Sequence, residues 1–319
     1  MFGPQKIVIQ NKRIKYDFEL NRSITIIRGD SATGKTALVD MVREYENQGS
    51  DSGIQLFAEK HCCVLEGSKW QSLLNNISDS IVFIDEGNSF VSSKDFASAI
   101  QGSSNYYVIV TRESLETLPY SVDEIYGIRS EGKYGGIKQT YNQMYRIYSK
   151  PDNQNVSPKL IITEDSNSGF EFFNAVSGDS HCISADGKSN IFKKLTEFSS
   201  DKKILIIADG AAFGSQMEKI MNYRLVNNNF TLYLPESFEW LILSSGILED
   251  SEIKSVLESP SKYIDSAKYI SWEKFFTSLL IDKTKISYLK YSKKKLNPAY
   301  LQESVKKAIL EAAKGIRLS

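Results

Sequence analysis

Eight residues near the N-terminus combine two glycines, a lysine and a hydroxyl group at a spacing that suits phosphate binding. Gly29 to Thr36 reads Gly-Asp-Ser-Ala-Thr-Gly-Lys-Thr and fits the pattern G-x-x-x-x-G-K-[ST]. Glycines let the backbone approach phosphate oxygens, so that successive N–H groups and the positive end of the next helix surround the anion. In this pattern Lys35 reaches the β- and γ-phosphates, while the Thr36 hydroxyl binds Mg²⁺.

The flanking sequence separates this interpretation from a chance Gly-Lys-Thr in a surface turn. An apolar run at 24–27 predicts a buried strand before the loop, and the helical spacing of apolar residues over 35–47 predicts a helix after it. A strand–loop–helix context favours a site for a nucleoside triphosphate such as ATP. The residues expected to contact the nucleotide are Gly29, Asp30, Ser31, Ala32, Thr33, Gly34, Lys35 and Thr36.

Two further strand-like runs in the first half end in polar residues. The run Ser-Ile-Val-Phe-Ile at 80–84 is followed by Asp85 and Glu86. Asp85 would orient Mg²⁺ through its water shell, and Glu86 could polarise the attacking water. Another run, at 106–110, leads to Arg112, which could reach the γ-phosphate because strand ends carry the site in parallel sheets. Arg112 could equally begin a surface loop.

The second half places two acidic residues directly after apolar strands. Strands and helices alternate from 159 onward, which predicts a second parallel sheet. Glu164 and Asp209 follow two of its strands, so we expect them side by side. Adjacent carboxylates repel unless a divalent cation lies between them, which favours Mg²⁺ or Mn²⁺ with Asp165 or Glu239 as a third ligand. The alternative for Glu164 and Asp209 is helix capping.

Both halves resemble known families. The expected hairpin of strands 7–9 and 14–18 before the loop resembles ABC-type ATPases, although a Leu-Ser-Gly-Gly-type signature is absent. The second half resembles the Toprim fold of topoisomerases, primases and some nucleases, which has Glu after its first strand and Asp-x-Asp after its third. Glu164 matches the Glu and Asp209 the first Asp, whereas Ala211 stands at the second. The order of the halves is similar to overcoming-lysogenisation-defect (OLD) family nucleases and related phage-defence proteins.

These patterns define the expected fold and domains. We expect an α/β protein with a P-loop NTPase domain followed by a Toprim-like parallel α/β domain with C-terminal helices. The first domain would span 1–149, a polar linker with two prolines 150–158, and the second domain 159–319. The last helix would begin after Asn297.

Composition is that of an ordinary globular protein. The 319 residues are 41% hydrophobic and 24% charged, and 39 basic residues balance 39 acidic ones, so net charge does not indicate a nucleic-acid partner. Basic residues are concentrated at 283–319, including Lys293-Lys294-Lys295, which forms either a solvated helix face or a nucleic-acid contact.

The cysteines and the hydropathy profile favour a cytoplasmic protein. Cys62, Cys63 and Cys182 cannot form a disulfide framework, and the pairs of His and Cys lack structural-zinc spacing. The N-terminus lacks the features of a signal peptide. No run approaches the length of about 18 apolar residues that predicts a membrane-spanning helix, so we expect no membrane partner.

The resemblance implies an ATPase whose second domain is a metal-dependent nuclease acting on nucleic acid, with Glu86, Glu164 and Asp209 as catalytic residues. Thr36, Asp85, Glu164, Asp209 and Glu239 would be the metal ligands. The alternative is an ATP-switched module that binds a partner and has a degenerate, non-cleaving Toprim-like domain, because Ala211 replaces an acid. A nucleotide kinase is disfavoured by the absence of an arginine-rich lid. A homo-oligomer is plausible because many P-loop ATPases complete their sites with a neighbour's arginine.

Overall fold

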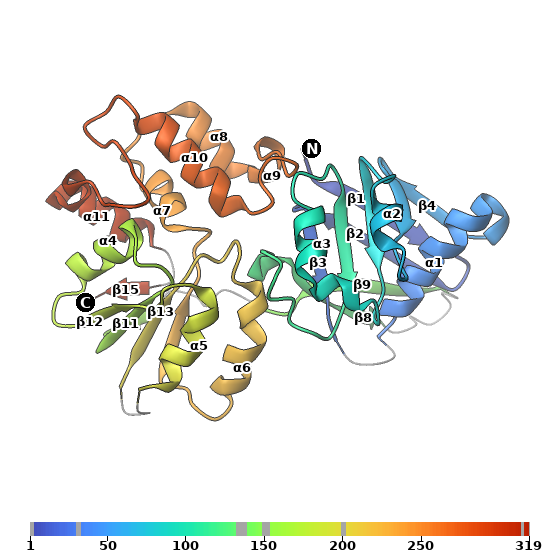
Figure 1. Cartoon of the computed structure of the whole chain (residues 1–319), viewed down its shortest axis with the longest axis horizontal. Helices are drawn as coiled ribbons and strands as arrows, with labels where there is room; N and C mark the ends of the chain where they lie inside the picture. Colours follow the sequence, from blue (N-terminus) through green and yellow to red (C-terminus); the bar gives the residue numbers. More distant parts are fainter. Residues whose placement is uncertain are drawn as a thin grey trace. The chain divides into compact units, whose positions relative to one another are not determined.

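The computed structural model describes residues 3–29, 33–131, 139–148, 154–198, 202–313 and 316–318. The chain divides into two units (Figure 1). Unit 1 consists of Met1–Tyr148 and Ser259–Ile270, and unit 2 of Ser149–Glu258 and Ser271–Ser319. Both units are built from strands and helices, so the chain has a mixed α/β fold.

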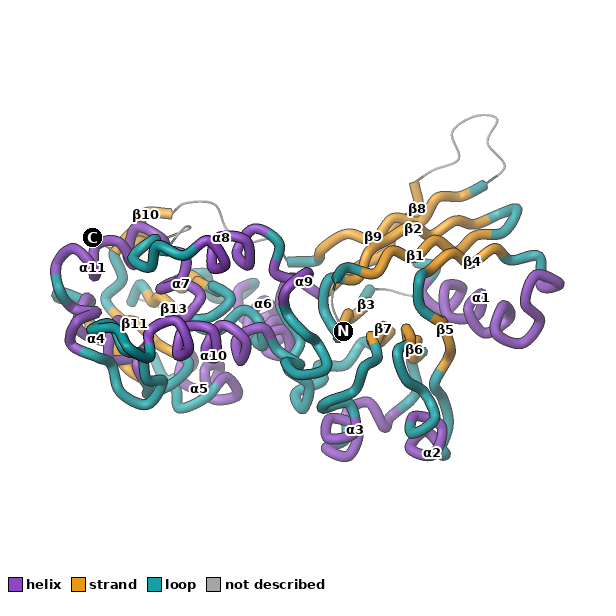
Figure 2. Tube along the Cα trace, turned by 90° about the horizontal axis from the view of Figure 1, so that it is seen from above, coloured by secondary structure: helices purple, strands orange, loops and turns teal. Residues whose placement is uncertain are grey.

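Unit 1 is built on one large mixed sheet. Its described strands follow the order β4-β1-β2-β9-β8-β3-β7-β6-β5, which can be followed in Figure 2. The strands are β1 (Gln5–Gln10), β2 (Ile14–Leu20), β3 (Ile24–Ile27), β4 (Gln55–Ala58), β5 (His61–Val64), β6 (Ser80–Ile84), β7 (Tyr106–Val110), β8 (Ile125–Glu131) and β9 (Thr140–Arg146). The β1–β2 pair is antiparallel, which confirms the predicted hairpin. From β8 through β3, β7 and β6 to β5, every neighbouring pair is parallel.

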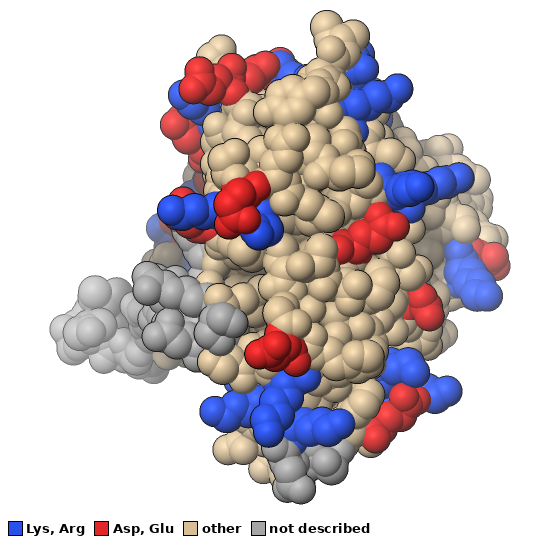
Figure 3. Space-filling model, turned by 90° about the vertical axis from the view of Figure 1, so that its left-hand side faces the viewer, with Lys and Arg blue, Asp and Glu red and all other residues tan. Residues whose placement is uncertain are grey.

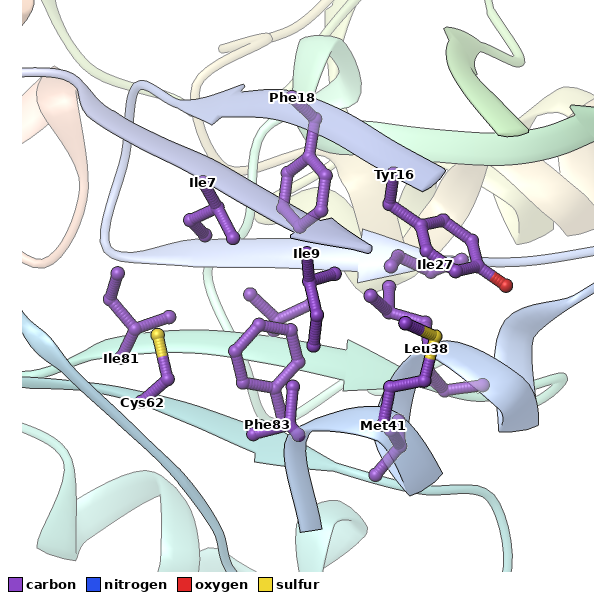
Figure 4. Close-up of a cluster of buried hydrophobic side chains, with 14 of the residues drawn as sticks. Ile7, Ile9, Tyr16, Phe18, Ile27, Leu38, Met41, Cys62, Ile81 and Phe83 are labelled. Carbon is purple, nitrogen blue, oxygen red and sulfur yellow. The ribbon is translucent and has the colours of Figure 1, made fainter. Parts of the chain in front are cut away.

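The three central parallel strands of unit 1 are buried on both faces. Every residue of β3, β6 and β7 is buried, as expected for strands covered on both sides. The helices of the unit are α1 (Lys35–Gln48), α2 (Trp70–Leu74), α3 (Lys94–Ala99) and α9 (Pro260–Tyr263). Figure 4 shows Leu38 and Met41 of α1 packed with apolar side chains of β1, β2 and β6. This packing holds the start of α1 at the end of β3.

The segment 259–270 belongs to unit 1, although the sequence predicts it inside the second domain. The Gly3 N–H donates to the Ser261 carbonyl at 2.8 Å, and Ser23 Oγ donates to the Ile270 carbonyl at 3.3 Å. These bonds join residues far apart in the sequence, and local periodicity contains no information about them.

The predicted linker is partly structured. Residues 150–153 lie outside the described residues, but β10 (Gln154–Val156) pairs in parallel with β15 (Ile316–Leu318). The strand forms because the C-terminal end of the chain supplies its partner, so a polar and aperiodic sequence becomes part of unit 2.

Unit 2 contains a parallel sheet, as the alternating pattern predicts. Its strands follow the order β12-β11-β13-β14, and every neighbouring pair is parallel. They are β11 (Leu160–Thr163), β12 (His181–Ser184), β13 (Ile204–Ile207) and β14 (Phe230–Tyr233). The helices that alternate with them are α4 (Ser168–Val176), α5 (Lys188–Thr196), α6 (Met217–Arg224) and α7 (Phe238–Ser244).

The C-terminal part of unit 2 is helical. It contains α8 (Ser251–Glu258), α10 (Trp272–Thr284), a 3₁₀ turn at Pro298–Leu301 and α11 (Glu303–Ala312). The predicted single last helix is therefore divided, because Gln302 adopts an extended conformation with ψ 141°. Within the described ranges, every helix is too short or too polar to cross a membrane.

Candidate functional site

The predicted phosphate loop connects β3 to α1 in unit 1. Asp30, Ser31 and Ala32 lie outside the described residues, whereas Gly29 and Thr33 to Thr36 are described. Lys35 is 5% exposed, and its Nζ donates to the Gly29 carbonyl at 2.6 Å and to Thr33 Oγ1 at 3.1 Å. The ammonium group therefore lies against the loop itself, while Thr36 is exposed on the first turn of α1.

The acidic pair and Arg112 lie at the same edge of the unit 1 sheet as this loop. Strand β7 lies between β3 and β6, and all three are parallel, so their carboxyl ends share one edge. Arg112 Nε is 2.8 Å from Glu86 Oε1, and both side chains are exposed. Asp85 Oδ1 accepts the Glu86 N–H at 2.8 Å, and burial raises the pKa of Asp85 above its usual value. The structure thus brings Glu86 and Arg112 into contact.

Arg28 is a residue at this edge that the sequence analysis does not identify. Its side chain is 7% exposed and donates to the Glu113 carbonyl at 2.6 Å and to Ser114 Oγ at 3.2 Å. It therefore ties the end of β3 to the segment that follows Arg112. Its position directly before Gly29, the first glycine of the loop, is the feature of the sequence that could have identified it.

A pocket in unit 2 collects the second set of predicted residues. It lies where β11 and β13 end, and its polar lining includes Glu164, Asp165, Asp209, Glu239, Tyr291 and Lys293. The predicted acids at the strand ends therefore share one cavity, together with two residues from beyond α10.

Glu164 and Asp209 are adjacent, as the parallel register requires. Thr163 pairs with Ile207, and Glu164 Oε2 accepts the Asp209 N–H at 3.0 Å. Burial, opposed by this hydrogen bond, raises the pKa of Glu164 to about 7. Burial and then the charge of Glu164 raise the pKa of Asp209 well above its usual value. At neutral pH, the Glu164–Asp209 pair therefore either remains protonated or requires a positive charge beside it.

The backbone after Asp209 fits tightly against the end of β14. A Cβ on Gly210 would lie 2.6 Å from the Leu234 carbonyl oxygen, so only glycine fits there. Ala211, at the position of the second Toprim acid, is 2% exposed and its N–H donates to the Glu236 carbonyl at 3.3 Å. Position 211 is thus filled by a small apolar side chain.

Helix capping does not account for Glu164 or Asp209. The N-cap of α4 is Asn167, and that of α6 is Gln216. Asp165 instead stabilises the turn before α4, because its Oδ1 accepts the Asn167 N–H at 3.3 Å. The capping alternative is therefore wrong for Glu164 and Asp209.

Glu239 lies near the start of α7 and is already hydrogen-bonded. It is 2% exposed, and Tyr291 Oη donates to its Oε1 at 2.8 Å. Burial and the charge of Glu239 raise the pKa of the Tyr291 phenol above its usual range. A metal ion at this carboxylate would share it with the tyrosine.

Like Tyr291, Lys293 and Glu273 are residues that the sequence analysis does not assign to this site. Burial would lower the pKa of Lys293, but the charges of Glu239, Asp209 and Glu273 raise it above its usual value. Burial also raises the pKa of Glu273, on α10. Lys293 belongs to the basic run that the sequence assigns to a solvated face or a nucleic-acid contact, and only tertiary folding directs it to the carboxylates.

Other basic residues of the C-terminal segment pair with acids on the surface. Lys283 Nζ lies 2.6 Å from carboxylate oxygens of both Asp250 and Glu252, and Lys306 Nζ lies 2.7 Å from Glu303 Oε2. Basic and acidic side chains are interspersed on the face seen in Figure 3. These pairs favour the solvated interpretation for this part of the segment.

The donor set of the unit 2 pocket suits a hard divalent cation, because buried carboxylates with raised pKa values carry unbalanced negative charge when ionised. Across the described ranges, no group of three or more His, Cys, Asp or Glu side chains is arranged to hold a metal ion as it stands.

The three cysteines lie outside both sites. Cys62, Cys63 and Cys182 are buried free thiols, and burial raises the pKa of each to about 12.

No protein-family model matches the chain, and no curated protein matches it significantly.

Proposed function

We propose that this protein binds and hydrolyses a nucleoside triphosphate, ATP with Mg²⁺, in unit 1, and that unit 2 is a metal-dependent nuclease. Unit 1 would then be a P-loop NTPase domain and unit 2 a Toprim-like domain. The observation that carries the first part is the common sheet edge of the Gly29–Thr36 loop, Asp85–Glu86 and Arg112. Polar groups that could bind phosphates, orient water and balance charge meet at that edge.

In unit 1, the loop N–H groups and Lys35 would bind the phosphates, and Thr36 and Asp85 would hold Mg²⁺. The Lys35 ammonium would exchange its bonds to the Gly29 carbonyl and Thr33 for phosphate oxygens. Glu86 would orient the attacking water. Its partner Arg112 would move from the carboxylate to the γ-phosphate, which would free Glu86 for the water.

In unit 2, Glu164 and Asp209 would hold Mg²⁺ or Mn²⁺, with Glu239 as a further oxygen donor. The bond from the Asp209 N–H orients the Glu164 carboxylate toward the cavity. When bound, the metal would activate water against a phosphodiester. Lys293 would contribute a positive charge next to a polynucleotide phosphate.

Variants at each site test the two parts separately. Lys35→Ala should abolish binding of a fluorescent ATP analogue, and Glu86→Gln should retain binding while hydrolysis falls. Glu164→Ala and Asp209→Ala should each abolish Mn²⁺-dependent cleavage of DNA and RNA. Cleavage that persists in both of these variants would contradict the nuclease assignment, and ATP binding by Lys35→Ala would contradict the loop assignment.

A second candidate is an ATP-switched binding module whose unit 2 does not cleave. The buried Ala211 and the Tyr291–Glu239 hydrogen bond favour it, because both reduce the number of free acidic oxygens in the pocket. It predicts nucleotide-dependent partner exchange with no cleavage of any polynucleotide in Mg²⁺ or Mn²⁺.

A further inference from the structure

A row of polar side chains crosses three neighbouring strands of unit 1 and ends at the phosphate loop. Tyr16 on β2 pairs in register with Asn142 on β9, and Asn142 pairs with Ser130 on β8. Tyr16 is fully buried and Asn142 is 4% exposed. Since strand partners place their side chains on the same face, the register alone aligns the three residues.

These side chains form a connected polar chain. Ser130 Oγ donates to Asn142 Oδ1 at 2.7 Å, and Tyr16 Oη donates to the Gly34 carbonyl at 2.7 Å. Between these two bonds, the Asn142 amide and the Tyr16 hydroxyl lie close together above Gly34. The Tyr16 ring packs beside Ile27 and Leu38 (Figure 4), which fixes the position of the hydroxyl group.

Gly34 fits closely under this chain. A Cβ built on Gly34 would lie 2.9 Å from Tyr16 Oη and 3.2 Å from Asn142 Nδ2. The φ angle of Gly34 is +93°, in the region that favours glycine. Both the conformation and the close approach therefore require glycine at this position.

The hydrogen bond to Gly34 also sets the direction of the next N–H group. In a trans peptide the carbonyl of Gly34 and the N–H of Lys35 point in opposite directions. The Gly34 carbonyl is held by Tyr16 and by the Leu38 N–H, which donates to it at 3.1 Å. The Lys35 N–H is thereby directed away from β2 and its side chains. A phosphate-binding loop requires its N–H groups to converge before the anion arrives.

We propose that Tyr16 and Asn142 are positioning residues of the nucleotide site, which hold the Gly34–Lys35 peptide in the orientation that binds phosphate. This inference rests on the proposed nucleotide binding by unit 1. Strands β2 and β9 then contribute to affinity without touching the nucleotide themselves.

The test compares two Tyr→Phe variants that remove equivalent hydroxyl groups. Tyr16→Phe removes the bond to Gly34. Tyr106→Phe is the matched control, because Tyr106 is 1% exposed in the same core and its Oη donates to the carbonyl of another glycine, Gly3, at 2.8 Å. Both variants should lower the melting temperature of the nucleotide-free protein to a similar extent. Only Tyr16→Phe should weaken binding of a fluorescent ATP analogue with Mg²⁺, by about fivefold, since one net hydrogen bond is lost.

A third variant tests the contact between Asn142 and Tyr16. Asn142→Asp keeps the size of the side chain but replaces the amide donor with an acceptor, which competes with the Gly34 carbonyl for the Tyr16 proton. We expect it to weaken nucleotide binding at least as much as Tyr16→Phe. In hydrogen–deuterium exchange of the nucleotide-free protein, the amides of residues 35–38 should exchange faster in Tyr16→Phe and in Asn142→Asp. Their exchange should be unchanged in Tyr106→Phe.

Each outcome decides the matter. Wild-type affinity and exchange in Tyr16→Phe would overturn the proposal, and equal losses in Tyr16→Phe and Tyr106→Phe would reduce Tyr16 to a stability role. If wild-type protein and Lys35→Ala both fail to bind the analogue, the proposed function of unit 1 fails. The exchange measurement then still reports whether Tyr16 orders the loop, so the two failures are distinguishable.

Discussion

The raised pKa of Glu164 makes the stability of the metal-free protein depend on pH in a defined direction. Its pKa rises from 4.5 to about 7 because the carboxyl is buried beside Asp209. Between these values the folded protein binds more protons than the unfolded chain. Protonated Glu164 therefore makes its full favourable contribution to the free energy of unfolding below pH 4.5, and this contribution is lost as pH rises through about 7.

The size of the effect follows from the shift. Each pKa unit corresponds to 1.36 kcal/mol, so ionising Glu164 in the folded state costs about 3 kcal/mol. Glu164 is half-buried and lines the cavity, and we therefore expect about 2 kcal/mol after a correction for solvent screening. Glu164→Gln cannot ionise but retains an oxygen for the Asp209 N–H. It should be more stable than wild type by about 2 kcal/mol at pH 8 and by only about 0.5 kcal/mol at pH 5.

Urea denaturation in EDTA at pH 5 and pH 8 measures this difference. Glu197→Gln is the control, because Glu197 is an exposed carboxylate of the same unit and should give the same small change at both pH values. Adding Mn²⁺ at pH 8 should stabilise wild type more than Glu164→Gln, since the ionised carboxylate is the proposed ligand. Equal stability differences at pH 5 and pH 8, or equal stabilisation by Mn²⁺, would refute the reasoning.

Three further variants test other parts of the two sites. Gly34→Ala should lower the free energy of unfolding by about 1–2 kcal/mol in urea denaturation, because alanine is strained at this φ and its Cβ meets Tyr16. The control is Gly67→Ala, also at positive φ but in open space. It should show only the part of the loss that comes from the backbone conformation. Glu86→Gln should lower the rate of ATP hydrolysis by about 10²-fold with little change in nucleotide affinity, measured by phosphate release and by titration; an unchanged rate would exclude Glu86 as the water-orienting base. Lys293→Met should tighten Mn²⁺ binding by about fivefold in calorimetric titration, because a cation beside the carboxylates no longer opposes the metal; weaker binding would show that Lys293 orders the site instead.

The sequence predicts those parts of the fold and sites that depend on local pattern. Apolar runs locate the core strands, and the parallel arrangement then places Glu164 beside Asp209 and Glu86 beside Arg112. These pairs are predictable because the residues follow their strands directly, and parallel strands end at one edge.

Other parts of the sites depend on long-range register. Tyr16 meets Asn142 because β2 pairs with β9, and no local pattern encodes that pairing. Lys293 and Tyr291 reach the acidic pocket from an irregular segment after α10, where their sequence resembles a solvated basic run. Hydrophobic periodicity predicts elements, but it does not determine which distant side chains complete a cavity.

Because residues 259–270 belong to unit 1 but lie within the sequence of unit 2, neither unit is encoded by one continuous stretch of the gene. The chain passes between the units at Tyr148–Ser149, Glu258–Ser259 and Ile270–Ser271. A fragment ending at Tyr148 lacks α9, and a fragment beginning at Ser149 carries α9 without the strands to which it belongs. A single recombination event therefore cannot transfer either unit intact to another gene. We therefore expect the two units to be inherited together as one gene segment. To express unit 1 alone, residues 259–270 would have to be joined to residues 1–148.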